Sequence, residues 1–272
     1  MPDLVHGAAQ FVVTKEHRRF TELCDAVRRE RYIGVCYGPP GVGKTLSARH
    51  YADWDILHPQ LNELGDYIHS VDDLALDART VFYTPKVHNT PRIIDKEVHF
   101  LQDRLSWAIE HTLYPDRHAA DLVKPPGTFA ELLIIDEGDR LKTAGLEQLR
   151  DHHDRTGIGL LLIGMPGIER RLARYPQLYS RIGFAHEYRP LGSDELTFVL
   201  EHHWSAIGLT LSAQDFTDAE AIAAVARITN GNFRLVQRLF AQITRILEIN
   251  AITTISCEVV ETAREALIIG NA

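Results

Sequence analysis

The residues most able to do chemistry lie in the segment GPPGVGKT, from Gly38 to Thr45. Its glycines let backbone N–H groups approach phosphate oxygens closely, and a helix that begins at the lysine adds its positive dipole end. Lys44 reaches the terminal phosphates, and Thr45 offers a hydroxyl to Mg²⁺. The alternative is a glycine-rich turn without a ligand. The predicted nucleotide-binding residues are Gly38, Pro39, Pro40, Gly41, Val42, Gly43, Lys44, Thr45 and Leu46.

Two acidic side chains follow the apolar run LLII and form the second motif. Asp136 and Glu137 are predicted at the carboxyl end of a strand, the edge where open α/β sheets bind ligands. An aspartate there organises the shell of Mg²⁺, so Asp136 joins Thr45 as a predicted metal ligand. Glu137 is predicted to be the base that orients an attacking water, with Lys44 assisting catalysis. The alternative is that both acids cap the helix that follows.

These motifs need a sheet to carry them, and the apolar patterns predict one. Short β-rich runs occur at 32–37, 81–84, 132–136, 159–164 and 184–188. Helical periodicity occurs at 15–30, 44–54 and 92–111. Such alternation is typical of a parallel sheet covered on both faces. The stretch from Ile56 to Thr80 is interpreted as a polar, irregular surface insertion, and 114–127 as a loop.

Beyond Pro190 the apolar pattern is helical throughout. We therefore predict an α/β fold, with a P-loop nucleotide-binding core whose parallel sheet is flanked by helices, followed by an all-helical subdomain. The expected domains are a helical lead-in at 1–30, the core at 31–190 and the helical subdomain at 191–272.

Composition excludes several other classes of protein. The formal net charge is -8, so any attraction to nucleic acid must come from local basic patches. The three cysteines are far apart, which indicates neither a disulfide framework nor a zinc site. No apolar run is long enough to span a membrane, so we expect no membrane partner. The adjacent histidines in RDHHDR and at His202–His203 lack ligand spacing and are interpreted as surface residues.

The two motifs, the strand between them, the strand after LLIIDE and the C-terminal helices together resemble the AAA+ ATPases. Within that group, VCYGPPGVGKTLSARHYADWD, LLIIDEGDRLK, GLLLIGMPGIERRL and RYPQLYSRIGFAHEYRPL are similar to the transposition proteins TnsC, TniB and MuB. The resemblance covers roughly residues 11–270, although only the phosphate loop and the acidic pair are individually specific. It implies a AAA+ core with a helical lid, ATP and Mg²⁺ as cofactors, and a bacterial cytoplasmic location.

The resemblance also implies roles for two arginines. Arg181 in YSRIGF would be a catalytic arginine finger that reaches the nucleotide of a neighbouring subunit, and Arg234 in GNFR would touch the nucleotide of its own subunit. A surface ion pair is the alternative for Arg181, and an ordinary helix-surface position is the alternative for Arg234. Nearby competitors for the finger are Arg170, Arg171 and Arg174.

Two further features bear on mechanism. The polar residue that AAA+ proteins carry after the strand at 159–164 is replaced by Gly164 and Met165, which predicts slow hydrolysis. The basic stretch from Lys86 to Arg104 corresponds to a part of the core that lines DNA in related transposition ATPases, with a solvated helix face as the alternative. Thr84 at the end of a strand is a weaker DNA-linked candidate.

The resemblance therefore implies an ATP-hydrolysing regulator of DNA transposition. It would form a homo-oligomer, as a ring, spiral or filament, on double-stranded target DNA. It would recruit or activate a DDE-type transposase together with a targeting factor. The alternatives are a replication initiator or helicase loader, a nucleotide-gated protein switch that does not touch DNA, and a small-molecule kinase.

Overall fold

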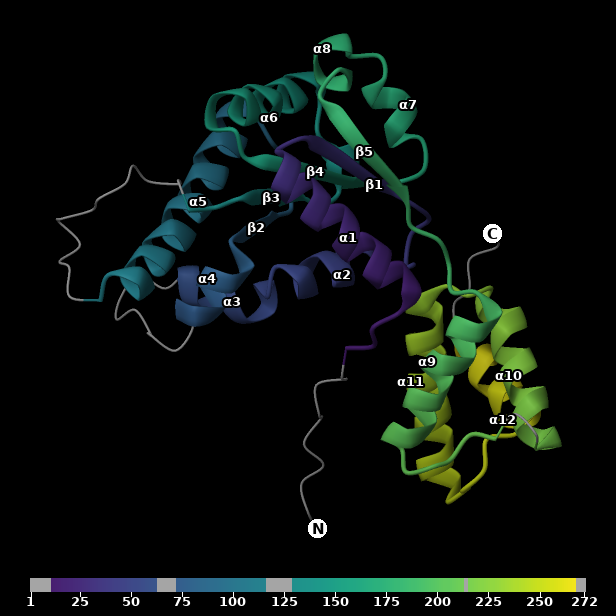
Figure 1. The fold of residues 1–272 in the computed structure, drawn as a ribbon. Coiled ribbons are helices and arrows are strands. Elements are labelled where there is room, and N and C mark those ends of the chain that lie inside the picture. Colours follow the sequence, from purple (N-terminus) through teal and green to yellow (C-terminus); the bar gives the residue numbers. More distant parts are fainter. Residues whose placement is uncertain (1–10, 63–71, 116–128, 213–214, 268–272) are drawn as a thin grey trace. The chain divides into compact units, whose positions relative to one another are not determined.

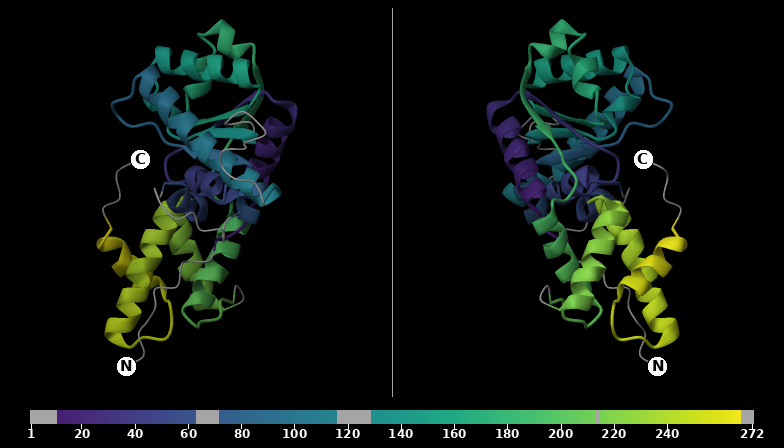
Figure 2. Two further views of the ribbon diagram at one scale, coloured as in Figure 1. Left: turned by 90° about the vertical axis from the view of Figure 1, so that its left-hand side faces the viewer. Right: turned by 90° about the vertical axis from the view of Figure 1, so that its right-hand side faces the viewer.

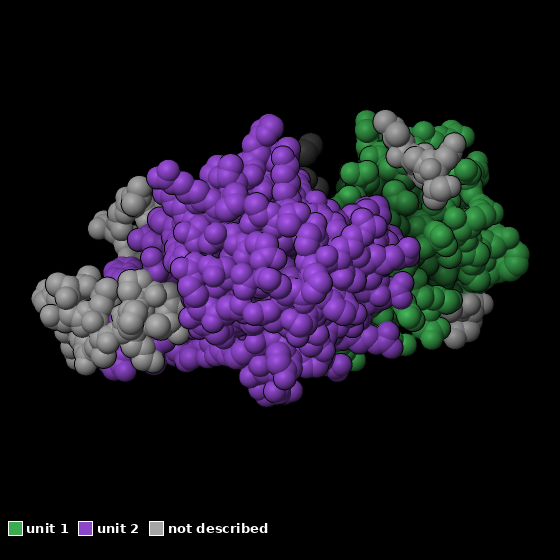
Figure 3. Space-filling view, turned by 90° about the horizontal axis from the view of Figure 1, so that it is seen from above, with its two compact units in different colours: residues 1–18, 41–43, 189–272 green, residues 19–40, 44–188 purple. Residues whose placement is uncertain are grey.

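A computed structural model describes residues 11–62, 72–115, 129–212 and 215–267. It divides into two compact units, coloured separately in Figure 3. The α/β unit comprises residues 19–40 and 44–188. The helical unit comprises residues 1–18, 41–43 and 189–272, so the tip of the predicted phosphate loop clusters with the C-terminal helices. The domain boundaries expected from the sequence stay predictions.

The α/β unit is built on a five-stranded parallel sheet in the order β2-β3-β4-β1-β5. Its central strands are continuous apolar runs because both faces are covered, so no alternation with polar residues occurs. This confirms the predicted α/β class. The strands are β1 (Ile33–Tyr37), β2 (Thr80–Tyr83), β3 (Leu132–Ile135), β4 (Gly159–Gly164) and β5 (Ile182–Glu187).

Helices connect the strands, with α2 to α4 on one side of the sheet and α6 to α8 on the other (Figure 1). The helix α5 is long, begins at a Thr90 cap that accepts from the Ile93 amide, and contacts α4, α6 and β2. The helices of this unit are α1 (Lys15–Glu30), α2 (Lys44–Tyr51), α3 (Trp54–Asn62), α4 (Asp72–Ala78), α5 (Pro91–Leu113), α6 (Thr143–Thr156), α7 (Ile168–Leu172) and α8 (Pro176–Tyr179), with a 3-10 turn η3 (Gly138–Arg140).

The predicted irregular insertion from Ile56 to Thr80 is wrong in its described parts, which form most of α3, all of α4 and the first residue of β2. Trp54, Leu57 and Leu61 lie on one face of α3 and are buried. Pro59 inside α3 disguised this periodicity, because proline normally ends a helix. Residues 63–71 and most of the predicted loop at 114–127 lie outside the described residues.

The helical unit packs four C-terminal helices around an apolar core. Figure 2 shows the ribbon of these helices from two sides. Trp204 and Phe240 are central to it, with ring centroids 5.0 Å apart. The predicted C-terminal helices are thereby confirmed. None of the described helices is long and apolar enough to cross a membrane. The four helices are α9 (Ser193–Ala206), α10 (Phe216–Thr229), α11 (Phe233–Asn250) and α12 (Cys257–Glu265).

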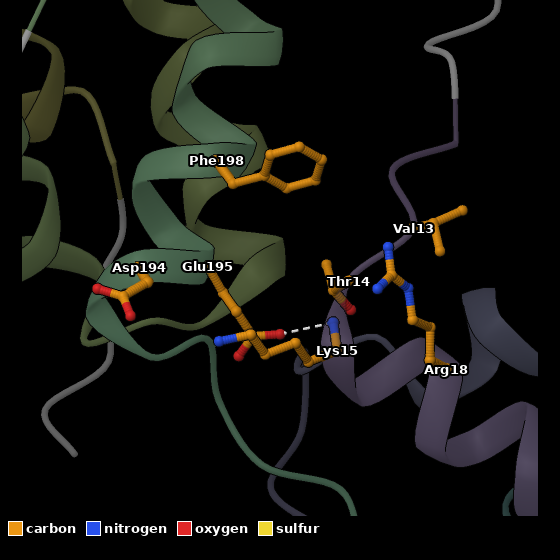
Figure 4. Close-up of a pocket in the computed structure, with 7 residues that line it drawn as sticks. All are labelled: Val13, Thr14, Lys15, Arg18, Asp194, Glu195 and Phe198. Atoms are coloured by element: carbon orange, nitrogen blue, oxygen red, sulfur yellow. Dashed lines mark hydrogen bonds between the residues drawn. The ribbon is translucent and has the colours of Figure 1, made fainter.

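The start of α1 belongs to the helical unit, where it meets the start of α9. The backbone N–H of Lys15 donates to Glu195 Oε1 at 2.8 Å. Beside this contact lies a cavity of about 170 Å³, which Phe198 and Arg18 line from the two helices (Figure 4). The start of α1 is thus part of the packing around α9.

Candidate functional site

The loop between β1 and α2 has a backbone that only glycine tolerates at several points. A Cβ on Gly38 would lie 2.1 Å from the carbonyl oxygen of Tyr188, so no side chain fits there. Gly41 and Gly43 have φ values of +80° and +114°, in the region that glycine enters without steric cost. The strand–loop–helix context that the GPPGVGKT motif requires is therefore present.

Lys44 is the first residue of α2, and its ammonium group folds back over the loop. Its Nζ donates to the carbonyl oxygens of Gly38 at 2.6 Å and Pro39 at 2.8 Å. The side chain is largely buried, with 9% of the residue exposed. A charged ammonium held against the loop backbone is suited to binding phosphate oxygens.

Thr45 and Asp136 come from separate motifs and meet at the carboxyl edge of the sheet. The Thr45 hydroxyl donates to Asp136 Oδ2 at 2.8 Å. Asp136 is 4% exposed and is anchored by its own backbone N–H, which donates to the Tyr83 carbonyl. Burial raises the pKa of Asp136, and the hydrogen bond from Thr45 acts in the opposite direction. A buried carboxylate of this kind is stabilised by a nearby cation.

Glu137 lies next to Asp136 but has a different environment. Its backbone is left-handed, with φ +49°, a conformation that costs a non-glycine residue of the order of 1–3 kcal/mol and is concentrated at functional sites. The side chain is about half exposed and forms an ion pair with Arg140. It makes no capping hydrogen bond to η3, so the helix-capping alternative does not describe Glu137.

Two residues that the sequence interpretation missed support this edge. The Tyr188 hydroxyl shares a 2.8 Å hydrogen bond with Ser47 of α2, and the Tyr188 backbone N–H donates to Tyr37 at the end of β1. Asp139 accepts from the Met165 backbone N–H at 2.6 Å. Its carboxylate also occupies the place that a side chain on Gly164 would need. The sequence signal that could have indicated this contact is the position of Asp139, three residues after Asp136.

The segment Gly231–Arg234 contacts the tip of the phosphate loop within the helical unit. The Arg234 backbone N–H donates to the Gly41 carbonyl at 2.9 Å. The Asn232 side chain caps α11 and lies where a Cβ on Gly41 would be. The structure therefore brings the predicted GNFR motif to Gly41, while the side chain of Arg234 is exposed.

Arg181 lies at the start of β5, away from these residues in the sequence. Its guanidinium forms a bidentate ion pair with Asp154 of α6, with N–O distances of 2.5 and 2.8 Å. A surface ion pair of this kind is the alternative to an arginine finger given above for Arg181. To reach the nucleotide of a neighbouring subunit, Arg181 would have to leave Asp154. Arg171, a competitor for the finger, donates to the carbonyl oxygens of Asp139 and Leu141.

The basic stretch from Lys86 to Arg104 borders a cavity of about 580 Å³ in the α/β unit. Phe82 and Phe100 contribute apolar walls, and Lys96 is exposed on α5. Lys86 is paired with Glu97, and Arg104 donates to the Leu61 carbonyl. Only part of the predicted basic stretch is thus available to an external ligand. Thr84 is exposed just after β2 and also lines the cavity.

The residues present fit a nucleotide and its Mg²⁺. The loop backbone is packed too closely at Gly38 and Gly41 to admit a side chain, and the Lys44 ammonium group donates to the loop carbonyls of Gly38 and Pro39. A hydroxyl and a carboxylate already side by side match the oxygen ligands that Mg²⁺ prefers. Thr45 and Asp136 are the residues that would hold the ion.

Comparison with known families and sequences agrees with this site. The sequence model of the family described as "AAA domain" matches residues 27–172. A "potential ATP-binding protein" of Staphylococcus aureus is 44% identical, covering 96% of this chain and 97% of the relative. The "Mu-like prophage FluMu DNA transposition protein B" of Haemophilus influenzae is 23% identical, covering 86% of this chain and 72% of the relative.

Solved structures share the fold. The Holliday junction branch migration motor RuvB of Thermotoga maritima aligns with a TM-score of 0.58 at 18% identity, over 96% of this chain and 71% of RuvB. The ORC2 protein of Aeropyrum pernix, as ADPNP-ADP complexes, aligns with a TM-score of 0.55 at 17% identity, over 94% of this chain and 70% of ORC2. At these identities the likeness establishes the fold alone.

Proposed function

This chain belongs to the AAA domain family, and from that premise we propose that it is a Mg²⁺-dependent ATPase that regulates DNA transposition. It would assemble as a homo-oligomer on double-stranded DNA and recruit or activate a DDE-type transposase with the help of a targeting factor. The 2.8 Å hydrogen bond between Thr45 and Asp136, beside Lys44, is the observation that carries the ATPase proposal.

Each residue of the site has a proposed part in binding and hydrolysis. The loop N–H groups and Lys44 bind the phosphates, while Thr45 and Asp136 hold the metal. Bound Mg²⁺ supplies charge neutralisation on the phosphate oxygens. Glu137 orients the attacking water and accepts its proton, after its carboxylate leaves Arg140. Because the ion pair between Glu137 and Arg140 must break first, we expect turnover to be slow in the absence of an activator.

Two arginines complete the proposed site. Arg234, whose backbone contacts Gly41, extends its exposed guanidinium to the nucleotide of its own chain. Arg181 reaches the nucleotide of a neighbouring chain once its pair with Asp154 opens. Hydrolysis would then depend on assembly, because one chain completes the site of the next.

Transposition is favoured by the similarity to a protein named as a DNA transposition protein over most of this chain. The net charge of -8 requires that DNA meets a local basic surface. Lys96 and Arg92 are exposed on α5 and are the proposed phosphate contacts. Contacts of this kind position a protein on DNA without reading bases.

The first experiment measures ATP turnover with and without duplex DNA, over a range of protein concentrations. We expect turnover to rise with DNA and with protein concentration. Electron microscopy with duplex DNA and a non-hydrolysable ATP analogue should show oligomers on the DNA, and ADP should reduce them. If the rate of ATP turnover does not change when DNA is added, and no oligomers form on the DNA, the transposition proposal is refuted. The ATPase proposal would remain.

A second arm tests the proposed DNA surface. The charge reversals Lys96→Glu and Arg92→Glu should each weaken DNA binding and flatten its salt dependence, because each removes a phosphate contact. Arg264→Glu on α12 of the helical unit is a matched control that should leave DNA affinity unchanged. If all three variants bind DNA with equal affinity, α5 is not part of the DNA interface.

A further inference from the structure

The helices α5 and α6 pack side by side and run in the same direction, as three successive contacts show. A Cβ on Gly145 would lie 2.9 Å from Ile94, so the helices are close at that level. Further along, Gln148 donates to Asp95 Oδ1 at 2.8 Å. One more turn along, the rings of His152 and His99 meet edge-on, with centroids 4.9 Å apart. The sequence numbers rise together on both helices.

The two adjacent histidines of α6 differ in how their ring nitrogens are satisfied. His153 is buried, and its Nδ1 bonds to the Ile158 carbonyl at 2.7 Å. His152 is only 4% exposed, yet its buried Nε2 has no hydrogen-bond partner among the residues the structure describes. Both residues were interpreted as surface histidines, which is wrong because α6 turns this face onto the core. A buried ring nitrogen without a partner is costly unless something supplies one.

Two further side chains of the kind that bind metal ions lie beside His152. Asp95 and His99 are four residues apart on α5, so they project from the same face of one helix. Each of these residues and His152 offers a ligand atom, and these atoms lie within 4.8 Å of one another. Asp95 and His99 remain partly exposed, which leaves a path for an ion to enter.

We propose that Asp95, His99 and His152 bind a first-row transition-metal ion of the Zn²⁺ type and thereby tie α5 to α6. Two imidazoles and one carboxylate are ligands that suit Zn²⁺, Co²⁺ or Ni²⁺ and not Mg²⁺. Atoms around a four-coordinate Zn²⁺ lie roughly 3.3–3.5 Å apart. Binding would require the partly exposed His99 and Asp95 side chains to move closer to His152, and water would complete the coordination.

The surroundings of the cluster are those that a metal site uses. Gln148 lies one helical turn before His152 and orients the Asp95 carboxylate through its amide. Groups that orient a ligand in this way commonly change metal affinity by about 10–100-fold when removed. This site is separate from Thr45 and Asp136 and does not depend on the proposed ATPase activity.

The test titrates the chelator-treated full chain with Zn²⁺ by calorimetry, with Mg²⁺ in excess to occupy the oxygen ligands of the sheet edge. Co²⁺ serves as a spectroscopic probe, because its d–d absorption reports nitrogen ligation and four-coordination. We expect one ion per chain and a rise in the thermal midpoint on binding. His99→Ala and Asp95→Asn change partly exposed residues and should each weaken binding at least tenfold, and Gln148→Ala by roughly tenfold.

His88→Ala is the matched control, because it removes an exposed histidine just before α5 without touching the cluster. It should bind Zn²⁺ like the wild type. Circular dichroism of the metal-free variants shows whether they are folded. The proposal is overturned if the wild type binds no Zn²⁺ under these conditions. It is equally overturned if His99→Ala and the control retain the same affinity and the same Co²⁺ spectrum.

Discussion

The carboxyl edge of the sheet and the face between α5 and α6 both hold a buried titratable side chain, but they satisfy it differently. Asp136 accepts a hydrogen bond from Thr45, whereas the Nε2 atom of His152 has no partner among the described residues. At the sheet edge, each motif is contiguous and follows a strand. Between the helices, the residues come from two separate segments and form no motif. The first place is therefore visible in the sequence, and the second is visible only after folding.

The largest expected effect is that of Lys44→Ala, which removes from the sheet edge the ammonium group that contacts the phosphate loop. We expect loss of ATP binding in fluorescence or calorimetric titrations, and no measurable turnover, because the phosphates lose their main counter-charge. Zn²⁺ binding at the α5–α6 face should be unchanged. Lys142→Ala changes an exposed lysine at the start of α6 and serves as the control. Tight ATP binding by folded Lys44→Ala would show that the loop is misinterpreted.

Arg181→Ala tests whether the ATPase site at the sheet edge needs an arginine from a neighbouring chain. If Arg181 acts on a neighbouring chain, turnover of the assembled protein should fall on the order of a thousandfold. Asp154→Asn breaks the same ion pair but keeps the arginine, so its turnover should be equal to or above that of the wild type. Both are measured in steady-state assays at protein concentrations that support assembly. An equal loss in both variants would assign Arg181 a structural role only.

Glu137→Gln keeps the shape of the site and removes its proposed base. ATP binding should persist while turnover falls roughly a hundredfold or more, because general-base catalysis is lost. Assemblies on DNA should then live longer, which dissociation kinetics would measure. Arg140→Ala removes the ion-pair partner of Glu137 and leaves the base in place, so that variant should still hydrolyse ATP. Normal turnover in Glu137→Gln would exclude the residue from the mechanism.

The smallest expected effect is on stability, and it concerns the ion pairs of Glu131, which lies just before the start of β3. Glu131 pairs with Arg28 at 2.6 Å and with Arg79 at 3.1 Å. Burial acts to raise the pKa of Glu131, but the two arginines outweigh it and hold the pKa below its usual value. The stabilisation is therefore present above the unfolded pKa of about 4.3 and is lost as the pH falls through the folded value.

Glu131→Gln should accordingly lower the free energy of unfolding by about 0.5–1 kcal/mol at neutral pH, a value reduced by solvent screening of this partly exposed pair. Urea denaturation at pH 7 and near pH 3 measures the difference between variant and wild type. The difference should shrink at the lower pH, because protonation of Glu131 removes the charge that the two arginines stabilise. A constant difference at both pH values would show that the charge of Glu131 contributes nothing.

Much of the fold was predictable because the apolar runs have clear lengths and boundaries. The run GLLLIG is buried along its whole length as β4, and LLII ends at the residue before Asp136. The helix α3 was missed because Pro59 broke a pattern that tertiary packing of Leu57 and Leu61 restores. Local patterns therefore predict elements well where burial is uniform, and less well where packing overrides a helix-breaking residue.

The sequence by itself determined the sheet class, the phosphate loop and the acidic pair, because each depends on residues adjacent in the chain. The sequence also predicted that Thr45 and Asp136 share one metal ion, and the structure joins them by a hydrogen bond. Only the tertiary structure decided that Arg181 pairs with Asp154 and that Asp95, His99 and His152 gather between two helices. The physical reason is distance along the chain. Contacts between remote segments depend on helix packing and strand order, which no short pattern encodes.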